Sequence, residues 1–418
     1  MSTTDWAWCK PVQVLPLWKY FHNGKTSSAK QVAQTVFELD VSEPSRVLAT
    51  HKESLAAVDG LPILIDEWSR APQSWDVVRR IVDEDERPGH FILTGSASKD
   101  NLNIHSGAGR IAQLLMRPLS MEERGLCQPC VRLSELLEGS VDKSIFEHCP
   151  VTISDYVHEI YSSGFPGIHR LSDSLVKVQI NGYIEDIIHK EFPEQGLKVR
   201  KPQILRSWLK AYAAATGSTT SYTKLLIAST PGEDIQPAAS TTLVYRNLLD
   251  ALYITDRIEA WLPTDNHFSA LGKSPKHYLV DPALAVRLLG LSYSSLISDN
   301  KKPLGKQKET SMLGRLFENL VASSLKTYCQ SNDAELYHLR TPAGDHEVDF
   351  IIVKGNRILG IEVKLAHEVS RDDVKHLDWL SSKLDAANRV TKVIINTGEY
   401  AYQRADGVVV IPLALLGA

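Results

Sequence analysis

The stretch Pro62-Ile63-Leu64-Ile65-Asp66-Glu67-Trp68 decides the fold of the first part of this chain. It reads as a strand of continuous apolar residues that ends in two acids. Such a run is typical of a parallel strand that is buried on both faces, and ligands bind at the carboxyl end of such a strand. Asp66 would hold Mg²⁺ through water and Glu67 would polarise an attacking water, two tasks that carboxylates perform in a nucleoside triphosphatase. The alternative is a strand followed by a solvated turn.

Two neighbouring segments fit the same edge of a sheet. His90-Phe91-Ile92-Leu93-Thr94-Gly95-Ser96 is a second apolar strand, and it ends in small polar residues. Asn23-Gly24-Lys25-Thr26-Ser27-Ser28 opens a helical stretch and carries the second half of a phosphate-binding loop. In such a loop Lys25 would reach the β- and γ-phosphates, and the hydroxyl of Thr26 would reach Mg²⁺.

The first half of that loop departs from the pattern G-x-x-x-x-G-K-T. Lys19 stands where the first glycine belongs, and the bulky Tyr20 and Phe21 follow it. Such residues do not readily adopt the left-handed backbone that lets successive N–H groups converge on phosphate. The preceding strand would contain Pro16, which is unfavourable in a central strand. Either the nucleotide site is degenerate, or residues 1–22 come from an altered start or reading frame.

A second group of charges lies in two strand-like runs near the end of the chain. His346-Glu347-Val348-Asp349-Phe350-Ile351-Ile352 and Ile358-Leu359-Gly360-Ile361-Glu362-Val363-Lys364-Leu365 are otherwise largely apolar. With a strand period of two, Glu362 and Lys364 point to the same face, where buried charge is costly unless it is paired or bound to metal. Asp349 and Glu362 would hold a divalent cation, and Lys364 would steady the attacking water of a Mg²⁺-dependent phosphodiesterase. An ordinary solvated edge strand is the alternative.

The surroundings of these strands resemble the restriction-endonuclease-like, PD-(D/E)xK fold. The expected element order over residues 311–418 is α-β-β-β-α-β, which is the order of that fold. Its first helix would include Gly314–Val321, where Glu318 is available as a further metal ligand. The resemblance implies a nuclease-like α/β domain. Whether catalysis is retained stays open, because many members of this fold are inactive.

The motifs taken together resemble a family of prokaryotic AAA-type ATP-binding proteins with a C-terminal domain of unknown function that contains the nuclease-like fold. The resemblance runs from about residue 23 to the end, and it also rests on Ser106–Ile111 and Met116–Gly125. It implies ATP and Mg²⁺ as cofactors, bound through the residues named above, with Ser96 as a polar sensor near the γ-phosphate. Arg110 would stabilise γ-phosphate charge in the same or a neighbouring subunit, or would simply face solvent.

The middle of the chain reads as helical. Residues 151–197 would form a lid, and three short helices followed by a β-hairpin arm at Tyr253–Leu262 would form a winged helix. A winged helix binds DNA or a protein, and one cation on the candidate reading helix, Arg246, leaves both partners open. We therefore expect a multidomain α/β protein with a P-loop NTPase-type parallel sheet. Its segments would be an atypical N-terminus (1–22), an ATPase core (23–150), the lid (151–197), the winged helix (198–292), a linker (293–310) and the nuclease-like domain (311–418).

Composition limits the classes of protein to which the chain can belong. The 418 residues exceed one ordinary core, and a net charge of −4 gives no overall attraction to nucleic acid. The sequence contains neither a membrane-length apolar run nor a signal peptide, so we expect a cytoplasmic protein without a membrane partner. Five cysteines argue against a disulfide framework. Zinc ligation by Cys127, Cys130, His148 and Cys149 is an alternative to an ordinary loop.

Two functions remain open. The first is an ATPase-type switch whose nucleotide state controls a DNA-directed, nuclease-like domain with Asp349, Glu362 and Lys364 at its centre. The second is a regulator without catalysis that holds DNA or a protein partner. A homo-oligomer is compatible with either function, and the incomplete phosphate loop favours the second.

Overall fold

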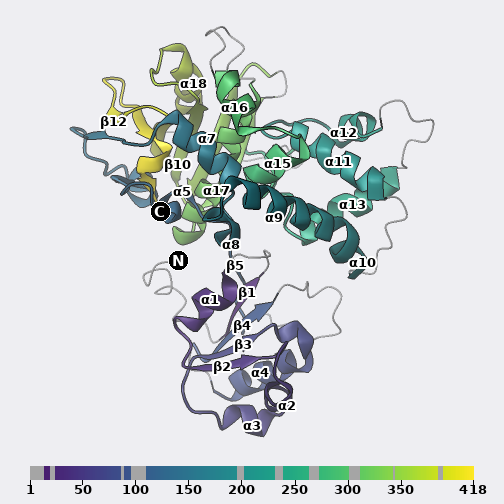
Figure 1. Ribbon diagram of the computed structural model, residues 1–418. Coiled ribbons are helices and arrows are strands. Elements are labelled where there is room, and N and C mark those ends of the chain that lie inside the picture. The colour runs from purple at the N-terminus through teal and green to yellow at the C-terminus, as the bar shows by residue number, and fades with distance from the viewer. Residues whose placement is uncertain are drawn as a thin grey trace. The chain divides into compact units, whose positions relative to one another are not determined.

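The computed structural model describes residues 14–18, 24–85, 89–95, 110–194, 202–230, 239–262, 273–300, 311–341, 344–384 and 389–418. The chain forms two compact units (Figure 1). The first comprises Met1–Arg117 with Ala251–Tyr253, and the second comprises Pro118–Asp250 with Ile254–Ala418.

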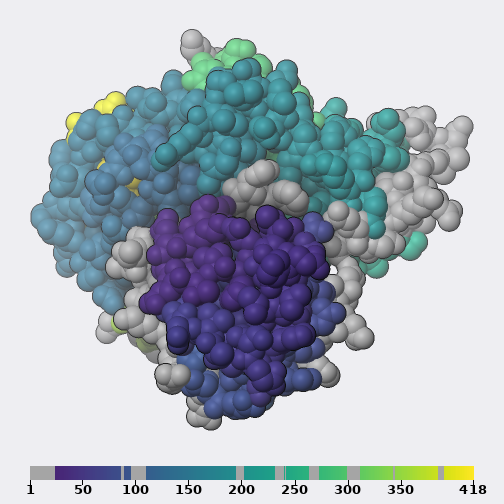
Figure 2. Space-filling view, turned by 60° about the horizontal axis from the view of Figure 1, so that its bottom comes forward, coloured from purple at the N-terminus to yellow at the C-terminus, as the bar shows by residue number. Residues whose placement is uncertain are grey.

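The first unit is built on a parallel sheet with the strand order β2-β3-β4-β1-β5. All its strand pairs run parallel, which confirms the expected α/β class. The strands are β1 (Val14–Trp18), β2 (Thr35–Glu38), β3 (Ile63–Asp66), β4 (Phe91–Gly95) and β5 (Leu114–Leu115). The helices are α1 (Lys25–Lys30), α2 (Glu43–Thr50), α3 (Lys52–Ala56), the short η2 (Trp68–Arg70) and α4 (Gln73–Glu84). Residues 24–85 form a compact purple-to-blue body in Figure 2.

Strand β1 lies inside the sheet, between β4 and β5, although it contains Pro16. The prediction of an interrupted strand was wrong at this position. Pro16 is in register with Leu93 of β4, whereas the described pairing with β5 begins at Leu17. The proline, which has no N–H to donate, thus has a strand neighbour on one side, as it would at a sheet edge.

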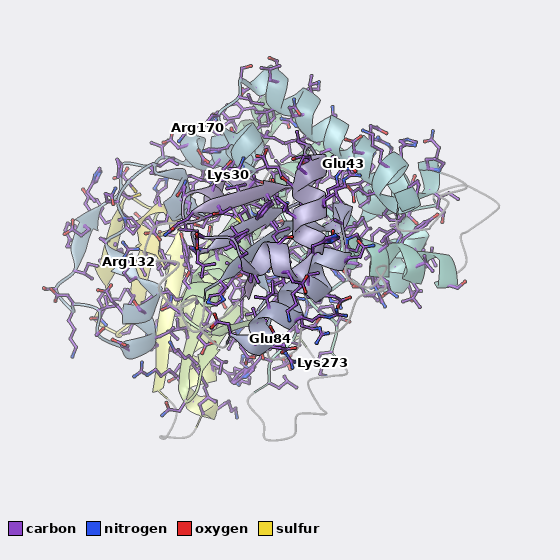
Figure 3. The ribbon with its side chains drawn as sticks, turned by 90° about the horizontal axis from the view of Figure 1, so that it is seen from below. Lys30, Glu43, Glu84, Arg132, Arg170 and Lys273 are labelled. Carbon is purple, nitrogen blue, oxygen red and sulfur yellow. The ribbon has the colours of Figure 1, made fainter. Side chains whose placement is uncertain are left out.

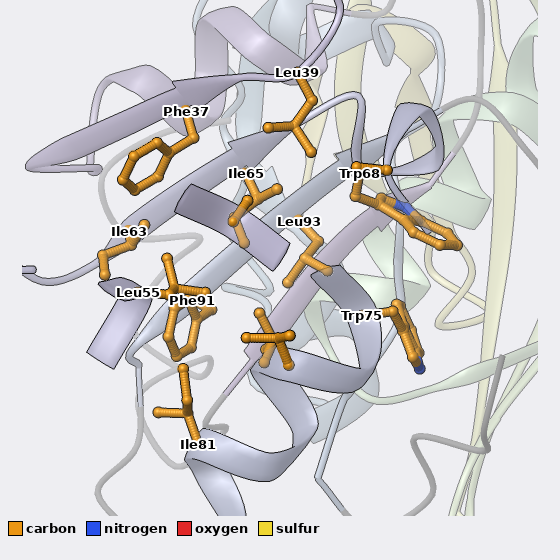
Figure 4. Close-up of a cluster of buried hydrophobic side chains, with 14 of the residues drawn as sticks. Phe37, Leu39, Leu55, Ile63, Ile65, Trp68, Trp75, Ile81, Phe91 and Leu93 are labelled. Atoms are coloured by element: carbon orange, nitrogen blue, oxygen red, sulfur yellow. The ribbon is translucent and has the colours of Figure 1, made fainter. Parts of the chain in front are cut away.

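The two faces of β3 pack into two separate apolar clusters. Ile63 and Ile65 belong to the cluster formed with α2, α3 and α4, where Trp75 is fully buried (Figure 4). Leu64 points to the other face and packs with Ala29 of α1. This alternation explains why the strand reads as a continuous apolar run. It fixes Asp66 at the carboxyl end of the strand, where the apolar run stops.

The second unit contains a mixed sheet of seven strands in the order β7-β12-β13-β11-β10-β9-β8. Strands β10, β11 and β13 run parallel, and the other pairs are antiparallel. The seven strands are β7 (Phe146–His148), β8 (Glu335–Arg340), β9 (Glu347–Lys354), β10 (Arg357–Lys364), β11 (Arg389–Asn396), β12 (Tyr400–Gln403) and β13 (Val409–Pro412). A separate pair joins β6 (Val131–Arg132) to β14 (Leu416–Gly417).

Residues 118–150, which we expected in the ATPase core, thus pack within the second unit. Strand β7 extends the C-terminal sheet through β12, and β6 pairs with β14. These strands are two and three residues long, so the sequence around them carries no periodic signal of its own.

Helices make up most of the remaining second unit, and the order α17-β8-β9-β10-α18-β11 agrees with the expected order of elements. The helices are α5 (Met121–Arg124), α6 (Leu133–Glu138), α7 (Ile153–Ser162), α8 (Pro166–His169), α9 (Asp173–Asp186), the π-helix η4 (Ile187–Glu191), α10 (Phe192–Glu194), α11 (Pro202–Ala214), α12 (Tyr222–Ala228), α13 (Ala239–Ala251), α15 (Pro282–Leu288), α16 (Tyr293–Asn300), α17 (Met312–Ser331) and α18 (Lys375–Lys383), with 3₁₀ turns η6 (Asp372–Val374) and η7 (Leu413–Leu415).

Residues 253–262, expected to form a β-hairpin arm, pair instead with residues 276–279. Isolated bridges join Thr255 to Leu279 and Ile258 to Lys276, and both run antiparallel. The backbone N–H of Lys276 donates to the Ile258 carbonyl at 2.9 Å, and the N–H of Ile258 donates back at 3.0 Å. Residues 276–279 also lie beside α17. The side chain of Asn319 donates to the Leu279 carbonyl at 2.9 Å.

Candidate functional site

The carboxylate of Asp66 is the meeting point of three elements of the first unit. It is buried, and its Oδ1 accepts hydrogen bonds from the hydroxyl of Thr26 at 2.8 Å and from the hydroxyl of Thr94. Thr26 lies on α1 and Thr94 on β4, one residue past the registered pair Ile65–Leu93. The structure thus brings together Thr26 and Asp66, as predicted. Sequence reasoning passed over Thr94, although it stands at the polar end of the apolar run of β4.

Lys25 and Glu67 flank this carboxylate. Gly24 adopts a left-handed conformation (φ 70°) before α1, and the side chain of Lys25 in the first turn is buried. Burial raises the pKa of the Glu67 carboxyl, while the charge of Lys25 acts against that rise and the charge of Asp66 adds to it. Glu67 itself has a left-handed backbone (φ 51°), which is strained for a residue with a side chain. Strained backbone of this kind clusters at functional sites.

The second group of predicted residues surrounds a lysine that the sequence did not single out. The ammonium of Lys276 lies 2.6 Å from Oε1 of Glu318 and 2.8 Å from Oδ1 of Asp349. Oε1 of Glu347 is further away, at 3.8 Å. The side chain of Lys276 is 2% exposed, so the ion pairs are shielded from water. No sequence pattern indicated this lysine, because its partner Asp349 is 73 residues away along the chain.

Glu362 and Lys364 stand beside this group on β10. Oε2 of Glu362 lies 3.8 Å from the ammonium of Lys364, which is also 3.6 Å from Asp373. The other carboxylate of the group, Asp349, accepts a hydrogen bond from the Val363 N–H at 2.9 Å through Oδ2. The acids of β9 and β10 therefore converge, as the strand pattern predicted.

Burial and charge act on these groups in opposite directions. Burial alone would lower the pKa of Lys276, but Asp349 and Glu318 outweigh it and hold that pKa well above its ordinary value. Burial alone would raise the pKa of Asp349, but the charge of Lys276 outweighs it and holds that pKa below its ordinary value. For Glu318 burial dominates and raises the pKa to about 7. Burial and the charge of Asp349 raise the pKa of Glu362 well above its ordinary value.

Comparison with known families divides the chain into three matched segments. Residues 22–125 match the AAA domain family. Residues 153–295 and 313–416 match two domains of unknown function, DUF8612 and DUF4143. Of residues 22–125, those up to 117 belong to the first unit, which is therefore of the AAA type. The AAA-type domain implies nucleotide binding, and the cluster around Asp66 lies within it.

Similar proteins were found over most of the chain. Uncharacterised proteins of Mycobacterium tuberculosis and Mycobacterium bovis are each 24% identical over 400 residues, which cover 93% of this chain and 77% of theirs. Among solved structures, the Walker-type ATPase of Pyrococcus abyssi matches with 13% identity and a TM-score of 0.37, over 66% of this chain and 91% of that one. The ORC2 protein of Aeropyrum pernix matches with 13% identity and a TM-score of 0.31, over 72% of this chain and 92% of that one.

Arg110, which was predicted to act on the γ-phosphate, pairs with an acid other than Asp66. Arg110 forms an ion pair with Asp83, in the last turn of α4. Because α4 runs back from the carboxyl end of β3 to the start of β4, its last turn lies at the amino ends of the strands, away from Asp66. Lys30, at the end of α1 and labelled in Figure 3, was not among the predicted site residues and pairs with Glu38 of β2. Ser96 and residues 19–23 lie outside the described residues.

Within the described ranges, no group of three or more His, Cys, Asp or Glu side chains is arranged to hold a metal ion. The ammonium of Lys276 contacts both Asp349 and Glu318. Of the cysteines considered for zinc, Cys127 contacts the Ala414 carbonyl at 3.2 Å, and burial, with Cys149 and Cys130 nearby, raises the pKa of its thiol to about 11. No described helix is both long and apolar enough to cross a membrane.

Proposed function

We propose that this protein is an ATP-dependent switch in which the AAA-type domain binds nucleotide with Mg²⁺ and controls the second unit. The observation that carries the proposal is the convergence of Thr26 and Thr94 on Asp66 at the carboxyl edge of a parallel sheet. Hydroxyl and carboxylate oxygens are the ligands that Mg²⁺ prefers, so these residues fit the ion. Once bound, Mg²⁺ would neutralise charge on the β- and γ-phosphates.

The residues of the site divide the work of nucleotide hydrolysis. Lys25 would bind the β- and γ-phosphates, and Thr26 and Asp66 would hold the ion. Glu67 accepts a proton from the attacking water, and its raised pKa brings this base closer to neutral pH. Ser96 is the proposed polar sensor. Arg110, which pairs with Asp83, would act only on a nucleotide held by a neighbouring subunit.

Calorimetric titration of the full chain with ATP and Mg²⁺ tests the switch. We expect Lys25→Ala to weaken binding at least about tenfold, a loss of about 1.4 kcal/mol, because the phosphates lose a cation at a buried position. Lys30→Ala is the matched control, since this lysine lies on the same helix but is exposed and paired with Glu38. Equal affinities of the two variants would refute nucleotide binding through Lys25.

For the second unit, the arrangement at Asp349 favours the regulator without catalysis over the nuclease. A metal-dependent nuclease needs an open place for its cation, and Lys276 fills the space between two of the expected ligands. Incubation of the full chain with plasmid DNA and either Mg²⁺ or Mn²⁺ separates the two functions. We expect no cleavage. Metal-dependent nicking that Asp349→Ala abolishes would restore the nuclease.

The partner of the second unit is proposed to be DNA or a protein. The candidate reading helix, α13, offers Arg246, whose guanidinium lies over the ring of Tyr222 at 4.6 Å from its centre. A cation held against a ring in this way is less available to phosphate. The geometry therefore favours a protein partner for α13. A DNA-binding titration at low salt tests this, since tight, salt-sensitive binding would favour DNA.

A further inference from the structure

The most unusual side chain of the second unit is a fully buried lysine surrounded by acids. Lys276 has two carboxylate oxygens within hydrogen-bond distance, Oε1 of Glu318 and Oδ1 of Asp349. Its main chain is fixed by the two hydrogen bonds with Ile258. The main chain therefore fixes the position of the ammonium, and Lys276 is not a flexible surface side chain that has turned inward.

The carboxylates are held in the manner of metal ligands. Asp349 directs Oδ1 at the ammonium while Oδ2 accepts from the Val363 N–H. Glu318 accepts a further hydrogen bond from the Tyr278 hydroxyl. Neutral donors that orient a carboxylate and leave an oxygen for a cation are the usual outer shell of a metal site. Here the cation that the oxygens face is the ammonium.

A third carboxylate of the group has an unused oxygen. Glu362 is 5% exposed, and its Oε1 has no hydrogen-bond partner among the described residues. A buried carboxylate oxygen without a partner is costly, so its position calls for a ligand. Asp349 accepts from the N–H of Val363, the residue after Glu362, and Lys364 lies 3.8 Å from Oε2 of Glu362, so Glu362 lies beside the pair of Asp349 with Lys276.

We propose that the ammonium of Lys276 is the resident cation of the cluster formed by Glu318, Asp349 and Glu362, and that it takes the place of a divalent metal ion. Of the distances from the nitrogen to the two oxygens, 2.6 Å is at the upper end of the Ca²⁺–oxygen range of about 2.3–2.6 Å and 2.8 Å is slightly longer. Without the lysine, the oxygens of Glu318 and Asp349 that it now pairs would be left for another cation. The inference deepens the regulator without catalysis proposed above and is independent of the nucleotide site.

Binding of Mn²⁺ to the full chain, measured by calorimetry without nucleotide, tests the inference. In the wild-type protein we expect Asp349→Asn to leave Mn²⁺ binding unchanged, because the ion does not enter the cluster. Lys276→Met removes the ammonium and keeps the stem, and it should bind Mn²⁺ at least about tenfold more tightly than the wild type. The gain should disappear in the double variant Lys276→Met with Asp349→Asn.

Lys326→Met is the matched control. Lys326 is another lysine of low exposure in an ion pair, with Asp256, but it lies outside the cluster. Its removal should not raise Mn²⁺ affinity. If Lys276→Met does not fold, the comparison of Mn²⁺ binding between the wild type and Asp349→Asn still tests the inference, because neither protein is changed at Lys276. Mn²⁺ binding by the wild type that Asp349→Asn removes would overturn the inference, and so would a folded Lys276→Met protein without any gain.

These outcomes are separable from those of the nucleotide switch. An ion held at Asp66 is unaffected by Asp349→Asn, and loss of ATP binding in Lys25→Ala says nothing about the cluster. DNA cleavage by Lys276→Met in Mn²⁺, with none by the wild type, would support the replacement of the metal by the ammonium most directly.

Discussion

At the scale of single residues, burial decides the charge of His338. Its side chain lies on β8 and is 1% exposed. Nε2 bonds the Ser274 carbonyl at 3.2 Å, and Nδ1 is buried without a partner among the described residues. A proton on Nδ1 would therefore find no acceptor. Burial, with a contribution from the charge of Lys276, lowers the pKa of His338 to about 4.

This histidine should make the second unit sensitive to acid. The unfolded chain takes up the proton near pH 6.5 and the folded chain only near pH 4, so stability is lost as the pH falls through that window. Between pH 7 and pH 4 the wild type should lose about 3 kcal/mol more than His338→Gln, as judged by urea unfolding. His189→Gln, at an exposed histidine paired with Glu185, is the control. Equal acid sensitivity of all three proteins would contradict the assignment.

At the scale of elements, helix α18 packs closely on strand β10. A Cβ atom on Gly360 would lie 2.8 Å from Cδ2 of Leu380 and 3.1 Å from Cδ2 of Leu377. Both leucines are fully buried. The absence of a side chain at Gly360 is thus what lets the helix approach the strand.

Gly360→Ala should destabilise the second unit by about 1–3 kcal/mol, because the added methyl overpacks the contact between α18 and β10. Gly182→Ala is the matched control. Gly182 lies inside α9 with open space around the position of a Cβ, so alanine should stabilise by about 0.5–1 kcal/mol. Urea unfolding of the two variants checks the signs. If Gly360→Ala stabilises the second unit, the two leucines can move to accommodate the methyl group without loss of packing energy, which would contradict the prediction.

The sequence predicted elements whose signals are local. Helix α12, one of the three short helices expected in the middle of the chain, begins after Ser221, whose hydroxyl accepts a hydrogen bond from the Lys224 N–H and caps the helix. The sequence predicted equally clearly that β3 ends in an acidic residue. Thr94 and Lys276 were not predicted, because their roles depend on partners that the fold brings from distant parts of the chain. The same holds for β7, which is a strand only because β12 pairs with it.

At the scale of the whole molecule, the chain contains two units with separate apolar cores. The core of the first includes Trp75 and Ile81, and that of the second includes Leu377 and Ile394. Each core is assembled from residues of its own unit. The two units therefore meet the condition for unfolding as separate cooperative blocks.

Calorimetric unfolding of the full chain should show two transitions. Trp75→Ala removes a fully buried indole and should lower the stability of the first unit by about 3–5 kcal/mol. Leu377→Ala should cost the second unit about 2–5 kcal/mol. Each variant serves as the control for the other, since each should move one transition only. A single transition that both variants shift would show that the units unfold together.

The pairing of β7 with β12 and of β6 with β14 has a practical consequence for protein engineering. A fragment cut to residues 311–418 would leave β12 with a bare edge, and such edges recruit other chains and promote aggregation. Chimeras that exchange this region between relatives would need to transplant residues 118–150 along with it.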